Sequence, residues 1–210
     1  MKVVEELPSS STQALEHMTV EPTPSTGYSN RPYAYALVGV ALLIAVAWMN
    51  QDRIQPVTTG TVAPDFEVKN LEGGMARLSD HTAKVVLVNI LATWCLPCRI
   101  EMPSMERLYQ ELGDEEFEIM AVSIDAELGL LDKAGEVGGD IQAFADSLGL
   151  TFPMLHDPSG DIQRLYRTTG VPETFLIGRD GIIYKEVAGG TEWDAADHRE
   201  LIQRLLAASQ

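Results

Sequence analysis

The distribution of apolar and polar residues from about residue 63 onward predicts a mixed α/β domain. Residues 84–91 form a nearly continuous apolar run, which is typical of a central strand that is covered on both faces. Residues 117–124 repeat this pattern and predict a second buried strand. The order of the elements predicts a mixed central sheet with helices on both faces. Further predicted elements are helices over 97–112, 140–148, 164–166 and 195–208, and a hairpin of strands 174–177 and 182–184.

Side-chain spacing within two of these helices predicts which residues enter the core. Asp140 is the expected N-cap of the helix over 140–148, because a carboxylate at that position accepts hydrogen bonds from the first free N–H groups. The residues expected to face inward are Ile100, Met105, Leu108 and Leu112 in the first long helix, and Ile141, Phe144, Ala145 and Leu148 in the second.

The N-terminal part of the chain differs in composition from this domain. Residues 1–32 are rich in Ser, Thr, Pro and Glu and lack apolar periodicity, so we expect a disordered tail. Residues 33–49 carry no charge, and a helix of that length spans roughly 25 Å, at the short end for a bilayer core. We therefore predict one N-terminal transmembrane helix over 33–49, a linker over 50–62 and a globular domain over 63–210.

Two features bear on how the apolar segment is used. Tyr33 and Trp48 lie near its ends, where interfacial aromatic residues occur. Ala45-Val46-Ala47 resembles a signal-peptide cleavage site, but the preceding tail is long for a secretory leader. A retained signal anchor is therefore favoured, and cleavage after Ala47 stays open.

Composition restricts the size of the core and the class of partner. The chain has 210 residues, of which 45% are hydrophobic, enough for one ordinary core. Its formal net charge is −16, and its isoelectric point is near 4.5. This acidity argues against nucleic acid or an anionic membrane surface as a partner.

Both cysteines of the chain lie in one motif, Trp94-Cys95-Leu96-Pro97-Cys98, where a helix is predicted to begin. A helix N-terminus stabilises a thiolate, so Cys95 is the expected nucleophile and Cys98 the resolving thiol. A structural zinc site needs four ligands, and the four histidines form no HxxxH pair. The motif therefore predicts a redox-active disulfide that needs no metal or organic cofactor. Stable disulfide exchange belongs outside the cytoplasm, so we expect a single-pass protein of the cell membrane whose domain faces the periplasm or another extracytoplasmic space.

Three segments together resemble one family of redox proteins. They are residues 92–103 around the two cysteines, the loop and strand Gly170-Val171-Pro172-Glu173-Thr174-Phe175-Leu176-Ile177, and Ala63-Pro64-Asp65-Phe66 with Leu78-Ser79-Asp80. On these residues the chain from 61 to 208 resembles the membrane-anchored thiol–disulfide oxidoreductases of the TlpA/ResA type. The resemblance implies a thioredoxin-like fold and an extracytoplasmic enzyme, and several members of the family serve cytochrome c maturation.

The resemblance also implies roles for individual residues. Glu101 would carry protons for the less accessible thiol, because Asn89 stands where thioredoxins have a buried aspartate. The Val171–Pro172 peptide would be cis and would lie against the cysteines, with Trp94 framing the docking surface and Val171 pairing with substrate. The implied partners are a protein disulfide, such as the CxxCH segment of apocytochrome c, and a membrane electron donor.

Two other functions share some of these features. A peroxiredoxin requires Pro-x-x-x-Thr/Ser-x-x-Cys, and upstream of Cys95 the corresponding residues are Val88 and Ala92, so this pattern is missing. A copper- or haem-handling chaperone could hold a soft ion between the two thiolates, with help from Met102 and Met105.

Residues 126–139 form a longer connection than usual between a predicted strand and the next helix. A glycine-rich surface insertion explains the segment without any function. Four of its residues, Leu128, Leu130, Leu131 and Val137, would alternatively contact a partner, and the sequence does not decide between these interpretations.

Overall fold

The computed structural model describes residues 31–49, 57–113, 116–132 and 134–208. Most of the tail predicted over 1–32 and about half of the linker predicted over 50–62 lie outside these residues. The chain divides into two units, residues 1–54 and 55–210, which we describe separately.

The first unit contains the helix α1 (Arg31–Met49), and its large apolar side chains from Tyr33 onward are exposed. Among the described residues, no helix is both long enough and apolar enough to cross a membrane. The transmembrane helix that the sequence predicted over 33–49 is thus not found among the described residues.

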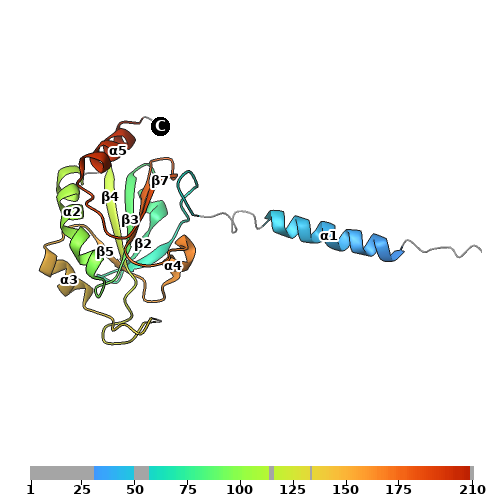
Figure 1. The fold of residues 1–210 in the computed structure, drawn as a ribbon, viewed down its shortest axis with the longest axis horizontal. Helices are drawn as coiled ribbons and strands as arrows, with labels where there is room; N and C mark the ends of the chain where they lie inside the picture. Colours follow the sequence, from blue (N-terminus) through green and yellow to red (C-terminus); the bar gives the residue numbers. More distant parts are fainter. Residues whose placement is uncertain (1–30, 50–56, 114–115, 133, 209–210) are drawn as a thin grey trace, which may run out of the picture. The chain divides into compact units, whose positions relative to one another are not determined.

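The second unit is built on a seven-stranded mixed sheet with the strand order β2-β1-β5-β4-β3-β6-β7 (Figure 1). The central strands β3, β4 and β5 run parallel, whereas β6 lies antiparallel to β3 on the other side. This arrangement confirms the predicted mixed sheet. The strands are β1 (Glu67–Asn70), β2 (Met75–Arg77), β3 (Val85–Leu91), β4 (Phe117–Ser123), β5 (Met154–His156), β6 (Glu173–Ile177) and β7 (Ile183–Ala188).

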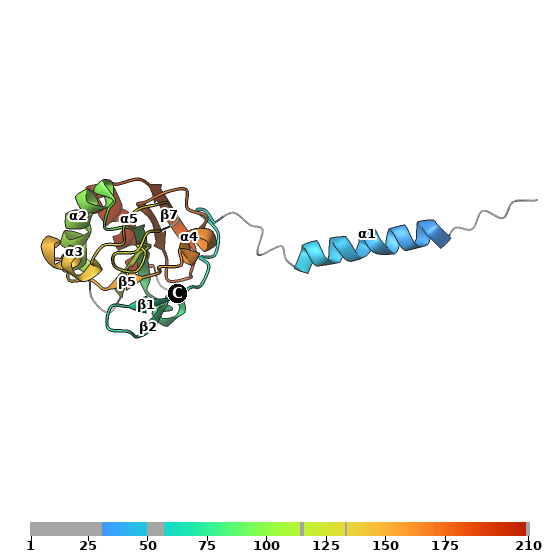
Figure 2. The same ribbon diagram turned by 90° about the horizontal axis from the view of Figure 1, so that it is seen from below.

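Helices cover both sides of the sheet, as the sequence predicted. Figure 2 shows the sheet nearly end-on, with α2 and α3 on one side and α4 on the other. On the α4 side, the Tyr166 ring packs against Phe66 and Phe175. The helices of this unit are α2 (Leu96–Leu112), α3 (Ile141–Leu148), α4 (Asp161–Tyr166) and α5 (Ala196–Ala207), with a 3₁₀ turn, η2 (Leu78–His81).

Helix α2 buries a different set of residues from the one predicted. Met105 and Leu108 are buried as expected, but Ile100 is 71% exposed and Met102 is fully buried. The helix begins after Cys95, and Cys98 faces the core. At 100° per residue, a side chain two positions after Cys98 points away from the sheet, which explains the exposure of Ile100.

Strand register brings three loops together at one end of the central strands. In the parallel pair of β3 and β4, Leu91 lies opposite Ser123, so both strands end together. In the antiparallel pair of β3 and β6, Ile90 lies opposite Glu173 at the beginning of β6. The turn after β3, the segment after β4 and the loop before β6 therefore meet at this end of the sheet.

The N-cap of α3 provides a test of the fold. The Asp140 carboxylate accepts a hydrogen bond from the Ala143 N–H at 2.9 Å, which confirms the predicted cap. We expect Asp140→Ala to lower the free energy of unfolding by about 1 kcal/mol, because the N–H loses its acceptor. Urea denaturation of the full chain measures this loss. Asp140→Asn keeps an acceptor oxygen and is the control, so an equal loss in both variants would contradict the capping role.

Candidate active site

The two cysteines form a disulfide at the beginning of α2, as the sequence predicted. Their Cα atoms are 5.3 Å apart. Cys95 is the N-cap residue of the helix, and its Sγ accepts a hydrogen bond from the Cys98 N–H at 3.2 Å. Cys95 is 4% exposed, whereas Cys98 is completely buried. The outer sulfur therefore lies at the positive end of the helix and closer to solvent.

The loop before β6 lies against the outer cysteine. The Val171–Pro172 peptide bond is cis, as the family resemblance implied. The carbonyl oxygen of Val171 lies 3.5 Å from Cys95 Sγ. Trp94, next to Cys95, is 37% exposed and lines the same groove as Val171. These predicted site residues are therefore brought together around Cys95.

Glu101 is buried beneath the disulfide-bearing turn of α2, three residues after Cys98. Its Oε1 accepts a hydrogen bond from Asn89 Nδ2 at 2.8 Å, and its Oε2 accepts one from the Thr191 N–H at 3.3 Å. Burial raises the pKa of Glu101 from 4.5 to about 7, and the hydrogen bonds from Asn89 and Thr191 oppose part of this rise. A surface carboxylate would show neither this burial nor this rise in pKa. Near neutral pH, Glu101 can therefore either accept or donate a proton.

Asn89 connects Glu101 to the strand that follows the cis-proline. Its Nδ2 also donates to Thr174 Oγ1 at 2.7 Å, and Thr174 is the residue opposite Asn89 in the register of β3 and β6. Within the described residues, Asn89 Oδ1 is buried without a hydrogen-bond partner. The amide is thus oriented entirely through its donor group, which points at the Glu101 carboxylate.

Asp125, which the sequence analysis missed, fixes the turn before Cys95. Its carboxylate accepts hydrogen bonds from the Thr93 N–H at 2.7 Å and the Thr93 hydroxyl at 2.5 Å. It also accepts from the Ser123 hydroxyl and, at 3.1 Å, from the Gly139 N–H. A Cβ atom on Gly139 would overlap the Thr93 hydroxyl, so this close approach requires glycine. An aspartate directly after a buried parallel strand was the available signal in the sequence.

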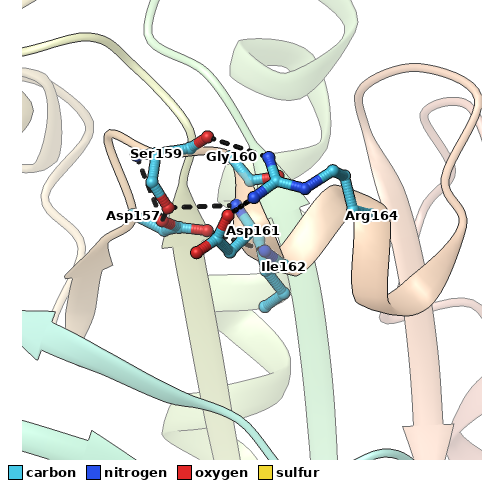
Figure 3. A network of polar contacts seen from close by, with 6 residues as sticks. All are labelled: Asp157, Ser159, Gly160, Asp161, Ile162 and Arg164. Carbon is cyan, nitrogen blue, oxygen red and sulfur yellow. Dashed lines mark hydrogen bonds and ion pairs between the residues drawn. The ribbon is translucent and has the colours of Figure 1, made fainter.

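A groove of about 400 Å³ adjoins the turn that carries the disulfide, and neither cysteine is among its lining residues. Trp94 and Val171 lie at its reactive end, and Ser159 and Gly160 form part of its wall. Asp157 fixes this wall, because its carboxylate accepts from the Ser159 hydroxyl at 2.6 Å and from the Ile162 N–H at 2.7 Å (Figure 3). The groove can therefore hold a polypeptide beside Cys95.

Comparisons with known proteins agree with this geometry. The sequence matches the AhpC/TSA family over residues 59–186. It is 36% identical over 148 residues to the thiol-disulfide oxidoreductase ResA of Geobacillus thermodenitrificans, covering 70% of this chain and 79% of the relative. It is 35% identical over 154 residues to the thioredoxin-like protein YneN of Bacillus subtilis, covering 70% and 85%. A crystal structure described as the thiol:disulfide interchange protein DsbE from Chlorobium tepidum is similar with a TM-score of 0.60 and 31% identity, over 72% of this chain and 99% of that chain.

The raised pKa of Glu101 predicts a specific dependence of stability on pH. Between pH 4.5 and about 7 the folded protein holds a proton that the unfolded chain has lost. The free energy of unfolding should therefore fall as the pH rises through this range, by about 3 kcal/mol in total from this group. Glu101→Gln cannot titrate, so we expect this component of the fall to disappear. Urea denaturation of the disulfide form at several pH values measures the effect without interference from free thiols.

Plots of the free energy of unfolding against pH should thus differ in slope between wild type and Glu101→Gln from pH 4.5 to 7. The two plots should be parallel above about pH 8. Glu106→Gln is the control, because Glu106 is partly exposed on the same helix. Parallel curves for wild type and Glu101→Gln over the whole range would show that Glu101 has an ordinary pKa.

Proposed function

We propose that this chain, which belongs to the AhpC/TSA family and is a thiol–disulfide oxidoreductase of the ResA type, reduces disulfides of protein substrates outside the cytoplasm. The observation that carries the proposal is the position of Glu101. A buried acid with a pKa of about 7 lies three residues after the buried Cys98 on the same helix. A buried thiol needs a nearby base before it can react, and Glu101 is ionised often enough near neutral pH to serve as one.

The reaction begins with the reduced enzyme. The Cys95 thiolate, stabilised at the helix N-terminus, attacks one sulfur of the substrate disulfide. A bond forms between Cys95 and that sulfur, and the other substrate sulfur leaves as a thiolate that takes a proton from water. The product of this step is a mixed disulfide between enzyme and substrate.

The second step releases the substrate. Cys98 gives its proton to the Glu101 carboxylate, and the resulting thiolate attacks Cys95 Sγ. The Cys95–Cys98 bond forms, the bond between Cys95 and the substrate sulfur breaks, and that sulfur leaves as a thiolate that takes a proton from water, while Glu101 returns its proton to water. Two electrons have moved from the enzyme dithiol to the substrate disulfide. A membrane electron donor that supplies two electrons and two protons would restore the dithiol.

The groove supports a polypeptide substrate. Val171 lies between the groove and Cys95 Sγ, so its backbone can pair with an extended segment that carries the disulfide. Apocytochrome c is the substrate we propose, because its CxxCH segment must be reduced before haem is attached. Support for this choice comes from the family resemblance.

The roles of the two cysteines can be separated by trapping. We expect Cys98→Ser to accumulate mixed disulfides through Cys95, because the resolving thiol is missing while the nucleophile remains at the helix N-terminus. Cys95→Ser should accumulate none, since Cys98 is completely buried. Non-reducing electrophoresis after incubation with a disulfide-bearing protein measures both. Equal trapping by the two variants would contradict the assignment of Cys95 as nucleophile.

The direction of electron flow can be read from the reduction potential of the Cys95–Cys98 couple. A reductase should have a potential near or below about −270 mV, as thioredoxin has, whereas a dedicated oxidant lies near about −120 mV. Equilibration with glutathione or dithiothreitol buffers, followed by thiol alkylation, gives the value. Deletion of the gene should lower holo-cytochrome c, and added small thiols should restore it. Normal cytochrome levels with under-oxidised secreted proteins would establish the opposite direction.

A further inference from the structure

Between β4 and α3, the described residues of the segment 126–139, which are 126–132 and 134–139, form a hairpin. Leu131 and Val137 are paired in an antiparallel bridge. The Gly138 N–H donates to the Leu130 carbonyl at 2.8 Å. In Figure 1 this segment extends beyond the helices and strands at the end of the domain. Backbone pairing of this kind gives the hairpin a defined shape.

Hydrogen bonds also join Asp132 to Ala134 and Glu136 within this hairpin. Its carboxylate accepts from the Ala134 N–H at 2.8 Å and from the Glu136 N–H at 2.9 Å. The Asp132 N–H donates to the Glu136 carbonyl at 2.8 Å. Asp132 is therefore held by side-chain as well as backbone contacts.

The base of the hairpin is joined to the turn that carries the reactive cysteine. Asp125 directly precedes the segment, and Gly139 ends it. The Asp125 carboxylate accepts from both the Gly139 N–H at 3.1 Å and the Thr93 N–H at 2.7 Å. Thr93 lies two residues before Cys95, so one buried carboxylate positions the hairpin and the active-site turn together.

The hairpin also forms part of the groove beside the disulfide. Asp132 and Ala134 line this groove together with Trp94 and Val171. A polypeptide bound in this groove lies next to the turn that carries Cys95 and contacts the hairpin at Asp132 and Ala134. Asp132 is the one charged side chain among the described residues that line the groove, so an acidic segment would be disfavoured.

Four aliphatic side chains of the hairpin are exposed: Leu128 (67%), Leu130 (61%), Leu131 (66%) and Val137 (56%). Leu131 and Val137 lie directly opposite each other, so their side chains share one face of the hairpin. Single exposed aliphatic residues are common, but a cluster on one projecting element is typical of an interaction surface.

We propose that the hairpin 126–139 is a docking arm that binds an extended substrate segment with aliphatic residues next to its disulfide. The inference rests on the proposed function and specifies its substrate class. We assign the substrate as the segment that binds the hairpin, because the hairpin adjoins the groove next to Cys95. Binding of aliphatic residues by Leu131 and Val137 would hold the substrate disulfide near Cys95 Sγ.

Two synthetic peptides test this proposal with the reduced full chain. Each peptide carries one intramolecular disulfide, and the flanking residues are Leu and Val in one peptide and Ser in the other. We expect wild type to reduce the aliphatic peptide with a kcat/KM about tenfold higher than that for the serine peptide, because about two methylene-sized groups become buried. In the double variant Leu131→Ser/Val137→Ser, the ratio of kcat/KM for the aliphatic peptide to that for the serine peptide should fall to about two or less. The cause would be a higher KM for the aliphatic peptide.

Met75→Ser is the matched control, because Met75 is 51% exposed on β2 at the far edge of the sheet and should leave the ratio unchanged. A second variant, Leu128→Ser/Leu130→Ser, should lower the ratio in the same direction. Equal rates of wild type with the two peptides would overturn the docking arm but not the reductase. Failure to reduce either peptide would overturn the proposed function itself. A change of oligomeric state in the Leu131→Ser/Val137→Ser variant, measured by sedimentation, would assign the aliphatic face to a second copy of the chain and overturn the arm.

Discussion

Strand β3 is the element on which the site depends. All seven of its residues are buried, and it is hydrogen-bonded to β4 on one side and to β6 on the other. A shift by one residue in either pairing would turn Asn89 away from Glu101, because side chains alternate between the two faces of a sheet. The register of β3 therefore fixes the positions of the cysteine turn and the cis-proline loop.

Burial of the Glu101 carboxylate in this core raises the free energy of its ionised form, and the hydrogen bonds it accepts offset only part of this rise. Glu101 receives two hydrogen bonds, yet its pKa still rises to about 7. Complete satisfaction would keep the carboxylate ionised at all physiological pH values and would remove its capacity to exchange protons. The incomplete compensation, with Asn89 as donor in place of a second acid, therefore suits a group that must change its protonation state.

Much of the domain could be predicted from the sequence because its determinants are local. The apolar run of β3, the paired cysteines and the turn of the hairpin between β6 and β7 each lie within a few residues of one another. The family resemblance supplied the cis-proline and Glu101, which no local pattern specifies. The phase of α2 was predicted incorrectly at Ile100, because a broad apolar stripe leaves the rotation of a helix uncertain. The contact between Asp125 and Thr93 joins residues 32 positions apart, a relation that the strand register reveals.

The sulfur of Cys95 has two tasks, since it is the reacting atom and also the group that caps α2. The folding of the helix and the chemistry of the enzyme thus share one atom. Evolutionary change at this position is doubly restricted, because serine would keep the cap and abolish exchange, whereas alanine would remove both. Helix α2 must also tolerate a cap that alternates between disulfide sulfur, thiolate and mixed disulfide in every catalytic cycle. The helix is seventeen residues long and buries Met102, Met105 and Leu108, so packing along its length keeps it folded while its first turn changes chemical state.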